Sequence, residues 1–121
     1  YILDAIDTVS AKIALAAYAD EHSIPLISSM GTGNKLHPEL FRISDLKDTS
    51  VCPLCRVMRK ELKTRGIQSL KVCWSPEKPL TPAPAEEDTG SRRSTPGSIS
   101  FVPPAAGLMI AGEIVRNICG L

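Results

Sequence analysis

Short apolar runs alternate with a segment of helical periodicity along the first part of the chain. Each run is bounded by polar or turn-forming residues, and its length is typical of a buried strand. Between the first two runs, Asp7-Thr8 is a helix start signal, and the Ala-rich segment to about His22 predicts a helix that packs closely on a sheet. Strand, helix and strand in this order predict a parallel α/β unit. The predicted strands span residues 1–6, 26–30 and 70–74.

Two further elements are predicted between the second and the third of these runs. Residues 40–43 are a candidate strand after a turn at His37-Pro38. Apolar side chains at helical spacing then predict a helix, and Gly66 is its expected end because glycine adopts the left-handed conformation that terminates helices. The apolar stripe of this helix consists of Val51, Leu54, Cys55, Met58 and Leu62.

The last part of the chain predicts a helix preceded by a long loop. Residues 76–96 contain five prolines, an acidic cluster and almost no apolar side chains, so we expect a mobile loop there. The chain is too short for several cores, and we expect residues 1–121 to be part of a single open-sheet α/β domain. Pro103-Pro104 precedes a helix whose broad apolar face we expect to be buried. That face comprises Ala106, Met109, Ile110, Ile114, Val115 and Ile118.

Composition and charge exclude several classes of protein. A net charge of +1 argues against a chain whose whole surface binds nucleic acid, although a local basic face is compatible with it. Four cysteines are too few and too unevenly spaced for the disulfide framework of a small secreted domain. No apolar run approaches the roughly 20 residues that cross a bilayer. We therefore expect a cytoplasmic protein with no membrane partner.

The first residues suggest that the chain continues a longer sequence. Tyr1-Ile2-Leu3 is already an apolar run of strand type, without an initiator Met or a polar lead-in. Because domain boundaries normally fall in exposed polar linkers, we expect residues that precede Tyr1 in the natural protein.

Two carboxylates follow the first predicted strand closely. Asp4 and Asp7 lie at its C-terminal end, where open α/β sheets bind their ligands. Position alone leaves two interpretations of Asp7. It is either the N-cap of the following helix, which accepts backbone N–H bonds, or a ligand of Mg²⁺ bound with a triphosphate, because hard cations prefer carboxylate oxygens.

Five segments of the chain together resemble one family of adenylating enzymes. Residues 3–12 (Leu-Asp-Ala-Ile-Asp-Thr-Val-Ser-Ala-Lys) are similar to the Asp-x-x-Asp stretch of the HesA/MoeB/ThiF superfamily, bacterial relatives of ubiquitin-activating enzymes. The other segments are most similar to the branch of the tRNA threonylcarbamoyladenosine dehydratases, and the resemblance covers nearly the whole chain apart from the Pro-rich loop. These segments are residues 22–35, 53–62, 72–79 and 97–103.

The resemblance implies a Rossmann-like open sheet, the C-terminal half of a ubiquitin-activating-like adenylation domain. It implies that Asp7 is the catalytic and cofactor-binding carboxylate, which holds Mg²⁺ together with ATP, and that Asp4 is structural. Enzymes of this branch adenylate the carboxylate of a threonylcarbamoyl group on a tRNA adenosine, and AMP leaves as the modification cyclises. The net change is an ATP-driven dehydration. The implied partners are tRNA, a second copy of the chain in a homodimer and a sulfur-transfer protein.

The resemblance also implies that most of the phosphate-binding groups are absent from this chain. The family's Gly-rich loop, its ribose-binding acid and its phosphate-contacting Arg and Lys all precede the position of Tyr1, so we expect the chain alone to be inactive. Gly31-Thr32-Gly33 does not replace them, because the third glycine of the dinucleotide-binding fingerprint is missing and no clear helix follows. We expect a turn there.

The spacing of Cys52 and Cys55 suits two ligands of a tetrahedral zinc site. Some superfamily members hold a structural zinc on two such pairs, but the dehydratase branch typically has an Asp and a small residue at these two positions. Cys55 also lies on the predicted apolar stripe, where a small buried side chain is an alternative interpretation. At a helix N-terminus, the thiol of Cys52 is a candidate for a lowered pKa. We expect Cys73 to pack in the core.

Basic residues form a second face on the helix that carries the Cys55 stripe. This face is either simply solvated or a set of phosphate contacts to tRNA, in which case binding weakens as salt is added. The chain has too few aromatic residues to offer a stacking platform for bases. The candidate tRNA contacts are Arg56, Arg59, Lys60 and Lys63, and Arg65 completes the face.

Two alternative functions stay open besides the tRNA-modifying dehydratase. One is a related enzyme that adenylates the C-terminal Gly-Gly of a ubiquitin-like sulfur carrier. The other is a degenerate scaffold that keeps the fold for dimerisation without activity.

Overall fold

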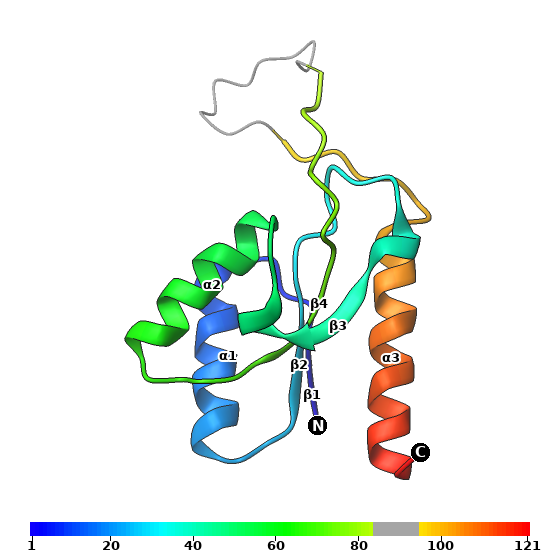
Figure 1. The fold of residues 1–121 in the computed structure, drawn as a ribbon. Coiled ribbons are helices and arrows are strands. Elements are labelled where there is room, and N and C mark those ends of the chain that lie inside the picture. The colour runs from blue at the N-terminus through cyan, green and yellow to red at the C-terminus, as the bar shows by residue number, and fades with distance from the viewer. Residues whose placement is uncertain (84–94) are drawn as a thin grey trace.

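Four strands form one mixed sheet in the computed structural model, which describes residues 1–83 and 95–121. The sheet order is β1-β2-β4-β3, with β1, β2 and β4 parallel and β3 antiparallel to β4 (Figure 1). This parallel arrangement confirms the α/β unit that the sequence predicts. The strands are β1 (Ile2–Asp4), β2 (Leu26–Ser29), β3 (Arg42–Asp45) and β4 (Lys71–Trp74).

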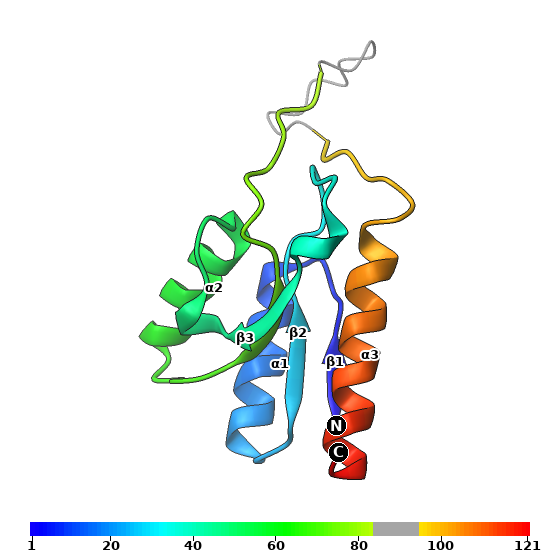
Figure 2. The same cartoon turned by 45° about the vertical axis from the view of Figure 1, so that its right-hand side comes forward.

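Helices cover both faces of this sheet. The helices α1 (Val9–Glu21) and α2 (Pro53–Thr64) lie on one face, and α3 (Pro103–Cys119) lies on the other (Figures 1 and 2). Short 3₁₀ turns at Pro38–Leu40 and Leu46–Asp48 flank β3. Gly66 has a φ of +74° directly after the last turn of α2, as expected for the residue that ends a helix.

The alternation of side chains along the central strands divides the core into two layers. Val72 and Trp74 of β4 pack with α1 and α2, whereas Cys73 between them packs with α3. Ile27 of β2 belongs to the α3 layer and is completely buried. The layer under α1 and α2 is the larger one and includes Ile13, Ala16, Met30, Leu46, Cys52, Cys55, Met58, Leu62 and Leu70.

Two predicted elements begin later in the structure than the sequence indicates. Leu40 lies in a 3₁₀ turn rather than in the third strand, because Pro38 starts that turn and its carbonyl accepts the N–H of Phe41. Val51 does not belong to the stripe of α2. It is 55% exposed with a φ of +64° in the loop before the helix, which begins only at Pro53.

The prediction that the whole apolar face of the last helix is buried is wrong for its outer side. Ala106 and Ile110 of α3 are buried against the sheet, but Val115 is 56% and Ile118 is 68% exposed. The reason is geometric, because α3 forms an outer layer by itself and only one side of it reaches the sheet (Figure 2).

Asn34 holds both ends of the Pro-rich segment. Its backbone carbonyl accepts the N–H of Leu80 at 2.8 Å, and its side-chain oxygen accepts the N–H of Gly97 at 2.6 Å. Residues 76–83 and 95–96 contain neither helix nor strand. The rest of the predicted mobile loop, residues 84–94, lies outside the described residues.

No helix in the described parts of the chain combines the length and the apolar character that a membrane span needs.

Candidate functional site

A cleft of about 830 Å³ opens at the carboxyl ends of β1 and β2. Ligands of open parallel sheets bind at this end, because the loops that follow neighbouring strands diverge there. The cleft wall includes Asp7 after β1 and Cys52 at the start of α2, so two of the residues singled out in the sequence meet here. The wall is formed by residues 5–7, Lys12, residues 29–35, residues 52–54, Pro79 and residues 96–98.

Asp7 reaches this cleft from the loop between β1 and α1 and is exposed. The N-cap of α1 is Thr8, with extended backbone and no side-chain capping bond. Asp7 therefore does not occupy the capping position that was its alternative interpretation. Its carboxylate faces an open cleft, which is the environment in which a carboxylate and several waters bind Mg²⁺.

Asp4 and Lys12 form a buried ion pair behind Asp7. The Nζ of Lys12 lies 3.1 Å from the Oδ2 of Asp4, and the two side chains are only 2% and 1% exposed. Lys12 also donates to the carbonyl of Ser29 at 2.6 Å, and Ser28 Oγ donates to Asp4 Oδ2 at 2.6 Å. Within the described residues, no buried side-chain nitrogen or oxygen lacks a partner. A charged side chain can be buried when its polar atoms have hydrogen-bond partners in this way.

This ion pair fixes the floor of the cleft. Asp4 ends β1, Ser28 and Ser29 belong to β2, and Lys12 belongs to α1, so one network joins three elements. The second carboxylate oxygen of Asp4 accepts the N–H of Ile6 at 2.9 Å and so holds the chain that leads to Asp7. The geometry gives Asp4 a positioning role and leaves the open carboxylate to Asp7.

Two lysines of the cleft were not assigned a role from the sequence. Lys12 occupies the same helical face as Ala16 and Ala19, and this periodicity is the signal that could have placed it inside. Lys35 is 6% exposed and donates to the carbonyl of Gly33 at 3.3 Å. No sequence pattern distinguishes Lys35 from a surface lysine, because it follows a turn rather than a periodic element.

The glycines after β2 form a turn, as expected. Gly33 approaches the far end of the Pro-rich segment closely, since a Cβ at this position would meet Pro96 Cβ at 3.1 Å and the Gly97 carbonyl at 3.4 Å. No helix follows directly; the next element is the 3₁₀ turn at Pro38–Leu40. Gly33 therefore permits close contact between two loops of the cleft.

Cys52 is the N-cap residue of α2 and is only 2% exposed. A hydrogen bond from the thiol of Cys55 lowers the pKa of Cys52 to about 5, helped by the backbone N–H groups of Cys55 and Gly31 and by the charge of Lys35, although burial opposes the shift. The same hydrogen bond, together with burial, raises the pKa of Cys55 well above its ordinary range. The two cysteines therefore shift each other's pKa in opposite directions, with Cys52 the more acidic of the two.

A zinc site is not completed by the described residues, in which no group of three or more His, Cys, Asp or Glu side chains converges. Cys52 and Cys55 supply at most two of the four ligands that a structural zinc needs. Cys73 lies on β4 in the core, and burial raises its pKa to about 11.

The basic side chains of α2 divide into two groups. Arg59 is half-buried, and its guanidinium donates to the carbonyl of Thr49 at 3.0 Å, so it ties α2 to the preceding loop. Arg65 pairs with Glu61 one turn away at 2.8 Å. The remaining three are exposed, and they are Arg56, Lys60 and Lys63.

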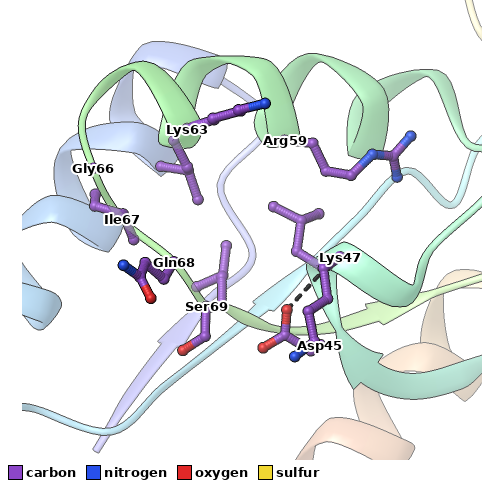
Figure 3. Close-up of a pocket in the computed structure, with 11 residues that line it drawn as sticks. Asp45, Lys47, Arg59, Lys63, Gly66, Ile67, Gln68 and Ser69 are labelled. Atoms are coloured by element: carbon purple, nitrogen blue, oxygen red, sulfur yellow. Dashed lines mark hydrogen bonds between the residues drawn. The ribbon is translucent and has the colours of Figure 1, made fainter.

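A second, smaller pocket of about 450 Å³ lies between α2 and the start of β4. Figure 3 shows Lys63 along its upper edge and Arg59 extending away from its centre. Asp45 accepts the N–H of Lys47 at the opposite edge, and Leu62 and Leu70 form an apolar floor. This pocket shares no lining residue with the cleft around Asp7, so it is a separate feature.

Comparisons with known proteins give a consistent result, although no family model matches the chain. The chain is 35% identical to the tRNA threonylcarbamoyladenosine dehydratase of Bacillus subtilis, over 98% of the chain and 50% of that protein. The crystal structure of the corresponding Escherichia coli enzyme superposes with a TM-score of 0.84 at 26% identity, over 99% of this chain and 48% of that one. The E. coli enzyme was also solved with AMP and with ATP, with TM-scores of 0.82 and 0.66.

These matches cover the chain almost completely, but the chain spans only about half the length of the relatives. The likeness in sequence and the likeness in structure point to the same enzymes, so the resemblance predicted from the sequence is confirmed. The chain therefore has the Rossmann-like α/β fold of part of a HesA/MoeB/ThiF adenylation domain, as found in the tRNA threonylcarbamoyladenosine dehydratases.

Proposed function

We propose that this chain forms the metal-binding side of the active site in an ATP-dependent tRNA threonylcarbamoyladenosine dehydratase. The observation that carries the proposal is the cleft at the carboxyl ends of β1 and β2, into which Asp7 presents an exposed carboxylate. Relatives of this name match nearly the whole chain, and the related E. coli enzyme was solved with AMP and ATP. We assign the activity to the cytoplasm, where tRNA and ATP are both available.

Asp7 is the residue that we assign to Mg²⁺. When bound there with ATP, the ion would neutralise negative charge on the phosphates as pyrophosphate leaves. Asp4 and Lys12 hold the backbone below Asp7 and neutralise each other, so they add no net charge to the cleft. Lys35 adds a positive charge to the cleft wall, and its burial strengthens its effect on an anionic ligand.

The tRNA would approach over α2 in this proposal. Arg56, Lys60 and Lys63 are exposed on this helix, whereas Arg59 is committed to Thr49. The N-cap Cys52 and the first residues of α2 line the cleft, so the exposed basic residues lie on a helix that starts at the cleft wall. Phosphate contacts of this kind orient a nucleic acid without reading its bases.

A homodimer is the assembly that we propose for the outer side of α3. Leu108, Val115 and Ile118 are all more than half exposed on this helix. An exposed apolar stripe on an outer helix is typical of a surface that another protein chain covers. A second copy of the chain is the occupant that we propose, and the alternative is the half of the relatives' length that this chain does not span. Sedimentation velocity of the wild type and of a Leu108→Glu variant tests this assembly, because only a dimer through α3 would be dissociated by the variant.

The proposed reaction is tested with the full-length protein and tRNA that carries threonylcarbamoyladenosine. We expect AMP and pyrophosphate to form in equal amounts with Mg²⁺-ATP, while the modified nucleoside loses one water, as measured by mass spectrometry. Adenylation that requires a ubiquitin-like carrier instead of tRNA would replace the proposal by the sulfur-carrier alternative. A protein that binds no nucleotide and remains dimeric would favour the scaffold.

A further inference from the structure

Two cysteines of the cleft wall form a pair that the proposed adenylation does not use. Cys52 is the N-cap residue of α2 and Cys55 follows three positions later, in the first turn of the helix. Neighbours at this spacing face the same side of a helix. Both cysteines are free, and both are buried in the same cluster under α1 and α2.

The surroundings of Cys52 favour a negative charge on its sulfur. Besides the thiol of Cys55, the backbone N–H groups of Cys55 and Gly31 favour the charged form, and they belong to two different segments, the start of α2 and the turn after β2. The ammonium group of Lys35 contributes from the same turn. This convergence of donors lowers the pKa of the Cys52 thiol to about 5, although the side chain is buried.

Access to Cys52 is through the cleft. It is part of the cleft wall but only 2% exposed, so a reagent must approach it from the cleft and must be small. Cys73 lies in the core on another element, and Cys119 is exposed near the C-terminal end of α3. Neither is part of the pair.

We propose that Cys52 and Cys55 are a reversible thiol–disulfide site in the cleft wall, at which Cys52 is the nucleophile toward small hydroperoxides and Cys55 is the resolving thiol. A zinc site would need further ligands, and the described residues bring none to this pair. A disulfide between positions three apart at a helix start is sterically accessible, because the Cα atoms of such residues are about 5–6 Å apart.

The chemistry needs only a hydroperoxide as the oxidant. The Cys52 thiolate attacks one peroxide oxygen, an S–O bond forms, the O–O bond breaks, and an alkoxide or hydroxide leaves. Cys55 then attacks the sulfur of the sulfenic acid, an S–S bond forms, and the departing hydroxide takes the proton of Cys55 as water. The two sulfurs lose two electrons in total and the peroxide gains them. A small dithiol reverses the reaction by exchange.

Oxidation would change the cleft as well as the cysteines. The negative charge on Cys52 would disappear, and with it the electrostatic interaction with the Lys35 ammonium group. Lys35 belongs to residues 29–35, which line the cleft. We therefore expect the oxidised protein to bind ligands in the cleft differently from the reduced protein, which makes the pair a redox control point whatever ligand the cleft takes.

Mass spectrometry of the intact full-length protein tests the proposal directly. After reduction and removal of the reductant, a few equivalents of hydrogen peroxide should produce a disulfide within the peptide that contains Cys52 and Cys55, and dithiothreitol should remove it. In a Cys55→Ser variant, a sulfenic acid at Cys52 should instead be trapped by dimedone. The matched controls are Cys73→Ser and Cys119→Ser, in which the disulfide should form as in the wild type.

A pH profile of alkylation provides a second readout that needs no variant. The rate at which iodoacetamide modifies Cys52 should be nearly constant from about pH 6 to pH 8, whereas an ordinary free thiol reacts about tenfold faster for each pH unit in this range. A rate for Cys52 that rises like that of the free thiol would overturn the proposal. So would oxidation of Cys119 without a disulfide at Cys52, or one zinc ion per chain retained by this pair. Each readout is independent of ATP and tRNA, so the proposed function can fail while this proposal stands.

Discussion

Lys12 donates a hydrogen bond to Asp4 across 3.1 Å, and the two side chains are 2% and 1% exposed. The pair connects the end of β1 with α1, and Ser28 and Ser29 extend it to β2. A carboxylate and an ammonium group that are both removed from water depend on each other, because either charge alone would be buried without compensation.

Replacing Lys12 by methionine should therefore be strongly destabilising. We expect a loss of about 3–5 kcal/mol in the free energy of unfolding, because Asp4 would remain buried without its partner. Urea denaturation followed by circular dichroism measures the loss. The exposed Lys60→Met variant is the matched control and should change stability by less than about 0.5 kcal/mol. Similar stabilities of the two variants would show that the buried pair contributes little.

Asp7→Asn should separate activity from folding. The side chain is exposed and does not cap α1, so we expect the melting temperature to stay within a few degrees of the wild type. In the full-length protein, formation of AMP with Mg²⁺-ATP should fall about a hundredfold or more, because the variant loses the negative charge that we assign to the ion. The control Asp20→Asn, exposed at the far end of α1, should keep full activity. Undiminished turnover in Asp7→Asn would reject the metal-binding role.

The Cys52 thiolate should make stability depend on pH. Its pKa is lowered from 9.0 to about 5 in the folded protein, so between these values the unfolded state binds more protons than the folded state. Stability gained from this group is therefore lost as the pH falls toward 5. Above pH 9, stability should fall again as the pH rises. The pKa of Cys55 is raised in the folded state, so only the unfolded state then releases the proton of Cys55.

The measurement is the difference in unfolding free energy between the wild type and Cys52→Ser at several pH values. We expect this difference to grow from about pH 5.5 to about pH 8. Cys73→Ser is the control, because the pKa of Cys73 is raised to about 11 and its thiol is neutral in both states over this range. Its stability difference should be constant. A flat profile for Cys52→Ser would mean that Cys52 is a neutral thiol.

The basic face of α2 should determine how tRNA binding responds to salt. Replacing Lys60 and Lys63 by glutamate should weaken tRNA binding by the full-length protein, and the slope of log affinity against log salt should decrease by roughly one for each phosphate that the variant no longer neutralises. Fluorescence anisotropy with labelled tRNA gives both quantities. Arg42→Glu on β3 is exposed and lies outside α2, so it should leave the slope unchanged. An equal effect of Arg42→Glu would indicate a diffuse electrostatic attraction rather than a tRNA-binding face.

The elements with strong periodicity were predictable from the sequence. The spacing of Cys55, Met58 and Leu62 predicts the buried side of α2, and all three are buried. Where local geometry overrides periodicity, prediction fails. Val51 continues the apolar pattern of α2 but lies before the helix, because Pro53 occupies the first position, where its fixed φ and missing N–H are tolerated.

The candidate site was only partly predictable. The end of an apolar strand indicates where Asp7 lies, since ligand sites of open sheets occur there, and the cleft is found at that point. The convergence of Cys52 with Gly31 and Lys35 had no signal in the sequence, because these residues come from loops that are about 20 positions apart. Their meeting depends on how α2 packs against the end of β2.

The sequence by itself determined the α/β class, the parallel unit and the position of Asp7 after β1, because hydrophobic periodicity and strand-end chemistry are local properties. Only the tertiary structure decided that Lys12 is buried on Asp4, that Gly31 and Lys35 help to lower the pKa of Cys52 and that the outer side of α3 is exposed. Burial, charge compensation and pKa depend on which segments meet in space, and residues far apart in the chain create those environments together.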